Sequence, residues 1–210
     1  MAISTYAELQ TATASWLDRT DLTSQIPNFI DLAEATFNRT IRNHRMITKN
    51  DSYSLGARYV NLPTDTLEII RIVLDTSPVI TLEYLTPEEI AERRMGLSST
   101  GKPIYFTVVG GSTNQIELLR SPGETYTSSI VYYTKIPALS DSATTNWLLT
   151  NHPDIYLFGT LVEAEPYLKN DERMPMWSAR LSKALEELKL QSEREMHTGS
   201  SLRMRSRVLG

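Results

Sequence analysis

Three histidines are the side chains best suited to chemistry in this sequence, and their spacing brings none of them together. His44, His152 and His197 are far apart, and no pair stands three to five residues apart on one helix, as zinc ligands commonly do. His152 precedes Pro153 and fits a residue leading into a helix, while His44 fits a helix end. The histidines therefore predict no metal site.

Other catalytic motifs are missing as well. Gly101-Lys102 is followed by Pro103, so the hydroxyl of a phosphate-binding loop is lacking. Glu163 and Glu165 are two residues apart and should point to different sides of a helix, which prevents their use as an acid and base pair. The absence of cysteine excludes disulfides, thiolate metal sites and cysteine catalysis. We expect no catalytic residue, metal or cofactor, with an enzyme of unknown type as an alternative.

The composition is that of a folded domain. Of 210 residues, 40% are hydrophobic and 22% are charged, and no apolar run approaches the ~18 residues that a membrane helix needs. Residues 1–20 carry Glu8, Asp18 and many polar residues, so we expect no signal peptide there. The length suits one sizeable core, or a core with a small satellite. Membrane, collagenous and wholly disordered proteins are excluded.

The charge is unevenly distributed along the chain. The formal net charge is −4, but residues 198–210 contain three arginines and no acidic residue. The acidic body should not attract nucleic acid, and its small arginine clusters, Arg39-Arg42-Arg45 and Arg93-Arg94, do not form the basic recognition helix of a helix-turn-helix. Asp31 and Glu34 oppose the first cluster. The cationic C-terminal segment is therefore a candidate binding arm.

Helical signals occupy both ends of the chain. Thr5 and Glu8 have capping-box spacing, and a second helix is predicted to begin at Ser24, with Pro27 in its first turn and an apolar stripe reaching Ile41. A third helix is predicted from Pro153 to about Asn170, and a fourth from about Asp171 to Met196.

Strand signals fill the middle of the chain. Apolar runs with frequent valine, isoleucine and tyrosine are followed by turn residues. Thr86-Pro87-Glu88-Glu89 predicts one short helix ending near Gly96, and residues 110–114 predict a hairpin turn. The predicted strands cover residues 53–62, 67–74, 79–85, 103–109, 115–119 and 128–136.

These patterns predict an α+β fold. Residues 1–49 and 147–197 are expected to form a four-helix bundle, because neither pair of end helices can bury its apolar stripe alone. Residues 50–146 are expected to be an inserted, mainly antiparallel β region with one short helix. Residues 198–210 would then be an extended C-terminal arm.

The order of the predicted elements and several short runs of residues also match the pattern of a known protein family. The chain resembles the head-to-tail adaptor (connector, or neck) proteins of tailed bacteriophages. The most specific run carries Pro166 within a helix and an acidic turn before the next helix. The matching runs cover residues 6–9, 16–22, 29–34, 59–63, 151–154 and 161–173.

The resemblance implies a structural protein of the virion neck, assembled in the host cytoplasm. Such adaptors form rings, typically of twelve subunits, that bind the portal protein, extend the DNA channel and provide a platform for a tail or nozzle protein. DNA would pass through the channel without specific binding, and no membrane is involved. A protein that completes the tail side of the neck is the alternative.

The resemblance also implies that the C-terminal arm docks on the portal. Apolar side chains alternate with arginines there, which is the period of an extended strand. Such a segment can add to a sheet edge, with its arginines bound to carboxylates. The candidate portal-binding residues are Leu202, Arg203, Met204, Arg205, Arg207 and Val208.

Overall fold

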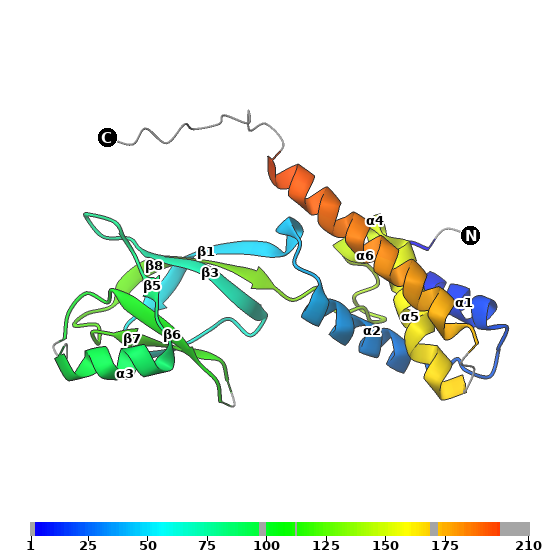
Figure 1. The fold of residues 1–210 in the computed structure, drawn as a ribbon, viewed down its shortest axis with the longest axis horizontal. Coiled ribbons are helices and arrows are strands. Elements are labelled where there is room, and N and C mark those ends of the chain that lie inside the picture. Colours follow the sequence, from blue (N-terminus) through cyan, green and yellow to red (C-terminus); the bar gives the residue numbers. More distant parts are fainter. Residues whose placement is uncertain (1–2, 97–99, 112, 169–171, 198–210) are drawn as a thin grey trace. The chain divides into compact units, whose positions relative to one another are not determined.

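The chain divides into two compact units in a computed structural model (Figure 1). The structure describes residues 3–96, 100–111, 113–168 and 172–197. We call residues 1–44 and 136–210 the helical unit, and residues 45–135 the β unit. Among the described residues there are six α-helices and two four-stranded sheets, which confirms the predicted α+β class. The four-helix bundle and the predicted domain boundaries stay predictions.

The helical unit is organised around α5, which packs against each of the other α-helices of this unit. The capping box of α1 is confirmed, since the Glu8 N–H donates to Thr5 Oγ1 and the Thr5 N–H donates to Glu8 Oε2. A short helix, α4, follows the Asn146 N-cap, and the sequence analysis did not predict it. The helices are α1 (Tyr6–Leu17), α2 (Ile26–Thr40), α4 (Trp147–Asn151), α5 (Pro153–Leu168) and α6 (Met174–His197).

Helix α2 differs from its prediction at both ends. Gln25, not Ser24, is the N-cap, and its side chain makes no capping bond, while Pro27 lies in the first turn as predicted. The helix ends at Thr40, and Ile41 is extended. The Arg42 guanidinium donates to the carbonyls of Asn38 and Ile41, so it satisfies carbonyls that the helix end leaves unpaired.

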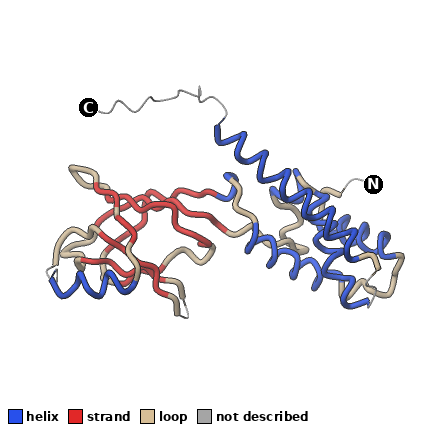
Figure 2. Tube along the Cα trace, viewed as in Figure 1, coloured by secondary structure: helices blue, strands red, loops and turns tan. Residues whose placement is uncertain are grey.

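The β unit contains two sheets, drawn in red in Figure 2. One has the strand order β1-β8-β3-β4 and is antiparallel throughout. The other has the order β2-β7-β6-β5, in which only β5 and β6 are parallel. The strands are β1 (Ile47–Leu55), β2 (Tyr59–Asn61), β3 (Thr66–Leu74), β4 (Ile80–Thr81), β5 (Glu83–Tyr84), β6 (Tyr105–Val109), β7 (Gln115–Leu119) and β8 (Tyr126–Thr134).

The predicted strand over 79–85 is two strands instead. β4 pairs with β3 in the first sheet, and β5 pairs with β6 in the second, so the chain changes sheets at Leu82. The Leu82 side chain is buried between them. The hairpin joining β6 and β7 is confirmed, because Val109 pairs with Gln115.

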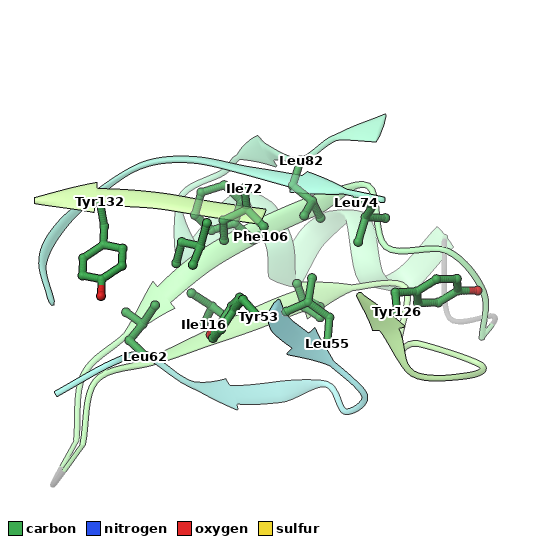
Figure 3. Packing of buried hydrophobic residues seen from close by; sticks show 12 residues of the cluster. Tyr53, Leu55, Leu62, Ile72, Leu74, Leu82, Phe106, Ile116, Tyr126 and Tyr132 are labelled. Atoms are coloured by element: carbon green, nitrogen blue, oxygen red, sulfur yellow. The ribbon is translucent and has the colours of Figure 1, made fainter. Parts of the chain in front are cut away.

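The two sheets enclose the hydrophobic core of the β unit (Figure 3). Ile72 and Ile130 come from the first sheet and Ile116 from the second, and all three are fully buried. Alternation along β8 places Ile130 and Tyr132 on the inner face, as expected for a sheet with one covered side. Each such apolar side chain contributes about 1.5–3 kcal/mol by leaving water.

Helix α3 (Pro87–Gly96) begins at the predicted capping sequence. The Glu89 carboxylate accepts from the Thr86 N–H and hydroxyl. The buried Ile90 side chain of α3 packs with Leu85 and Leu119 of the β unit. The helix is therefore fixed to the second sheet by an apolar contact and a capped first turn.

Candidate functional site

The candidate portal-binding residues, Leu202, Arg203, Met204, Arg205, Arg207 and Val208, lie outside the described residues. Their role stays a prediction. They follow α6, the last described element, whose final residue is His197.

The histidines occupy separate places in the helical unit. His44 begins a 3-10 helix (His44–Met46) beyond the end of α2, and its Nε2 atom lies 3.0 Å from Glu195 Oε2. Its N–H also donates to Ser192 Oγ at 3.1 Å, which ties this turn to α6. His152 lies between α4 and α5, as predicted. Among the described residues, no group of three potential metal ligands comes together.

The arginine clusters bind groups of their own chain. Arg39 donates to Thr36 Oγ1, and Arg94 donates to Glu117 Oε1 at 2.6 Å. Arg58 donates to the same Glu117 oxygen, so the carboxylate joins α3 to strand β7 and to the turn before β2. Arg93 lies over the Tyr105 ring, with its guanidinium carbon 4.8 Å from the centroid. These contacts position elements of the fold.

The expectation that Glu34 opposes the cluster Arg39-Arg42-Arg45 is wrong. Glu34 is 6% exposed, and its Oε1 atom accepts from the Tyr156 hydroxyl at 3.0 Å and from the Leu139 N–H at 2.9 Å. Asn146 donates to the Tyr156 hydroxyl at 2.6 Å and to the Pro137 carbonyl at 2.7 Å. We call Glu34, Tyr156 and Asn146 the buried polar network.

The buried polar network holds the segment that returns from the β unit. One turn after Glu34 on α2, Asn38 Oδ1 accepts from the Ile136 N–H at 2.8 Å. Residues 136–146 are thus fastened at Ile136, Pro137 and Leu139 before α4 begins. The signal was present in the sequence, because Glu34 stands four residues after Ile30 and three before Phe37, within the apolar stripe.

Burial raises the pKa of Glu34, and the hydrogen bonds from Leu139 and Tyr156 only partly oppose this effect. A raised carboxyl pKa means that the folded state holds this proton to higher pH than the unfolded chain, whose value is near 4.5. The group's contribution to stability is therefore fully present below pH 4.5 and is lost as pH rises through the folded pKa.

We expect Glu34→Gln to reduce the pH dependence of the free energy of unfolding. As pH rises above 4.5, the free energy of unfolding of the wild type should fall relative to that of the variant, because glutamine does not ionise. Urea titrations followed by tryptophan fluorescence measure the difference, since Trp16, Trp147 and Trp177 all lie in the helical unit. Parallel pH profiles for the two proteins would contradict the expectation.

Glu163 and Glu165 diverge, as predicted. Glu165 is 1% exposed and accepts from Trp177 Nε1 at 3.0 Å, whereas Glu163 accepts from Thr36 of α2 at 3.4 Å. The Trp177 ring also packs on Trp16, with 5.4 Å between centroids. Glu165 therefore orients an aromatic contact that joins α1, α5 and α6.

The contacts among the described residues hold the helices of the helical unit together and fasten the returning segment, residues 136–146, to α2. No described helix is long and apolar enough to cross a membrane. A search of curated proteins gave no match. A family model for the SU10 adaptor protein, however, matches residues 4–205.

The chain belongs to the SU10 adaptor protein family. This confirms the resemblance to bacteriophage head-to-tail adaptors, and the match covers both units of the fold. As an SU10 adaptor family member, the chain is a bacteriophage adaptor, and membership indicates a component of the virion.

Proposed function

We propose that this SU10 adaptor forms a ring in the virion neck, docks on the portal, extends the DNA channel and carries the tail or nozzle. The family match over residues 4–205 is the observation that carries the proposal. The role is structural, not enzymatic. Helices α1, α2, α5 and α6 are proposed as the four-helix bundle of each subunit. The subunits assemble in the host cytoplasm and act in the particle.

The ring is proposed to contain twelve copies joined by a repeated head-to-tail contact. Such a contact needs two different complementary faces on each subunit, and it closes when the rotation between neighbours divides a full turn. The formal net charge of −4 per chain gives the assembled ring a negative sum. Acidic side chains lining the channel would repel the phosphates and let DNA pass without specific binding.

The C-terminal arm is proposed to make the portal contact. Residues 198–210 carry Arg203, Arg205 and Arg207 and no acidic residue, so the arm is cationic while residues 1–197 are net acidic. An alternating strand can bind a sheet edge through its main chain, and its arginines can form paired hydrogen bonds with carboxylates.

We expect deletion of residues 198–210 to abolish portal binding while the subunit stays folded. All described helices and strands lie before residue 198, so the thermal unfolding temperature and the circular dichroism spectrum should hardly change. Size-exclusion chromatography with purified portal rings measures complex formation. A truncated chain that still binds portal would overturn the role of the arm.

A matched pair of variants separates the charge of the arginines from their bidentate hydrogen bonding. Replacing the three arginines with lysine keeps the charge but loses the planar, bidentate donors, whereas replacing them with glutamine removes the charge. We expect binding to weaken in the order wild type, lysine, glutamine. A chain that binds purified tail protein but not portal would instead support the tail-side completion role.

A further inference from the structure

Helix α2 exposes a row of side chains on the side that faces away from the core of the helical unit. The buried side of α2 includes Phe29, Ala33 and Phe37. The residues of the other side are exposed to solvent, and they follow the three- and four-residue steps of one helix face. We call this row the α2 stripe, and it consists of Asn28, Asp31, Leu32, Ala35 and Arg39.

Helix α6 exposes a second row near its start. Trp177, Ala184 and Leu188 are buried, and the residues beside them are exposed to solvent. The exposed residues again follow steps of three and four, beginning one turn before Met176. We call this row the α6 stripe, and it consists of Glu172, Met176, Ala179, Arg180 and Lys183.

The charged side chains of the two stripes have few partners in their own subunit. Arg39 donates to the Thr36 hydroxyl, and the Arg180 guanidinium lies over the Phe158 ring at 5.7 Å from its centroid. Neither arginine forms an ion pair with a carboxylate of the described residues. Both stripes are therefore open to a partner that carries the opposite charges.

We propose that the α2 stripe of one subunit packs antiparallel against the α6 stripe of the next subunit. This contact rests on the proposed ring, of which it is the repeated subunit interface. The intervals between residues are the same in the two stripes but run in opposite order, and each stripe is about 16 Å long. The facing pairs are Arg39–Glu172, Ala35–Met176, Leu32–Ala179, Asp31–Arg180 and Asn28–Lys183.

The order of the charges identifies a second copy of this chain as the partner. In the antiparallel register, the cation of the α2 stripe faces an anion and its anion faces a cation, so two ion pairs of opposite sense form together. A shift of one turn in one direction places Asp31 opposite Met176, and a shift in the other direction places Arg39 there. Either shift loses both ion pairs, and a parallel arrangement allows only one of them.

The two stripes of one subunit do not pair with each other. Helices α2 and α6 each pack against α5, and they use their buried sides to do so. Because the stripes lie on two different helices of the same unit, the contact between copies joins two different faces. This is the head-to-tail type of contact that closes into a ring.

The centre of the contact is apolar. Leu32 is 52% exposed and Met176 is 47% exposed, and the contact removes both side chains from water. Ala35 and Ala179 are small, so they allow the two helix axes to approach to about 8–10 Å. The apolar centre therefore provides affinity, and the flanking charges determine the register.

Charge reversal across the contact tests the ion pairs. We expect Asp31→Arg and Arg180→Asp each to weaken ring assembly on purified portal at least about tenfold, because two like charges then face each other. The chain that carries both changes forms the ion pair in the reversed sense, so its assembly should return to within about threefold of the wild type. Glu193→Arg, an exposed change on another side of α6, is the control and should assemble normally. Sedimentation velocity at increasing subunit concentration gives the midpoint of assembly.

Disulfide formation tests the register, because the wild-type chain contains no cysteine. A full-length chain with both Ala35→Cys and Met176→Cys places two thiols opposite each other across the contact, within reach of a disulfide. After mild oxidation on the portal, we expect a ladder of covalent multimers, because each copy is joined to two neighbours. The matched control combines Ala35→Cys with Ser182→Cys, on another exposed side of α6, and should give at least about tenfold less multimer.

The outcomes distinguish failure of this contact from failure of the ring. Assembly that neither single charge reversal weakens would overturn the contact and leave the ring intact. Single reversals that weaken assembly without recovery in the double variant would assign the stripes to another protein, as would equal ladders from the two cysteine pairs. A wild-type chain that forms no multimer on the portal would overturn the ring and the contact together.

Discussion

Gly159→Ala should destabilise the helical unit by about 2 kcal/mol or more, although alanine is the better helix former by about 1 kcal/mol. A Cβ atom at Gly159 of α5 would lie 2.4 Å from Cζ and 2.8 Å from Cε1 of Phe37 on α2. The Phe37 ring is 1% exposed and packs edge-on against Tyr156, with 5.3 Å between centroids. It therefore has little room to move away.

The measurement is urea unfolding followed by tryptophan fluorescence, which reports the helical unit. Phe37→Ala in the same chain supplies the space, so the double variant should lose less free energy than the sum of the two single variants. Gly96→Ala, in the β unit, is the control and is followed by circular dichroism, because a Cβ there meets nothing within 4 Å. A Gly159→Ala protein as stable as the wild type would show that α2 and α5 do not approach so closely.

Glu34→Ala should have the second large effect, a loss of about 2–5 kcal/mol in the free energy of unfolding. The change removes the acceptor of the Tyr156 hydroxyl and of the Leu139 N–H, and each buried donor left without a partner costs about 1–3 kcal/mol. Glu34→Gln should cost less, since its amide oxygen can accept the same two hydrogen bonds.

Hydrogen exchange distinguishes this local effect from general destabilisation. The amide of Leu139 should exchange much faster in Glu34→Ala than in Glu34→Gln, because its acceptor is lost. Asp31→Ala, an exposed change one turn earlier on α2, is the control and should leave that amide protected. Unchanged protection of Leu139 in Glu34→Ala would mean that the returning segment is held by other contacts.

Local signals in the sequence predicted much of the fold. The capping sequences at Thr5 and Thr86, the first-turn Pro27 and the hairpin at 110–114 depend on neighbouring residues, and the structure has each of them. The period of the apolar residues predicted the end helices and most strands. These features depend on interactions between residues that are close in the sequence, so they can be predicted from one sequence.

Long-range pairing could not be predicted in the same way. The run 79–85 has strand composition, but its division between two sheets depends on β3 and β6, and β6 is distant from it in sequence. Sequence reasoning placed Glu34 among the surface charges because its partners, Tyr156 and Leu139, lie more than 100 residues away. The candidate arm is predicted from charge, alternation and resemblance, and it lies outside the described residues.

Both chain connections of the β unit converge on one helix. The outgoing chain leaves from the end of α2, and the returning chain is bonded to Asn38 and Glu34 of that same helix. Any pull on the β unit is consequently divided between α6, which holds His44 of the outgoing chain, and α2, which holds Ile136 and Leu139 of the returning chain.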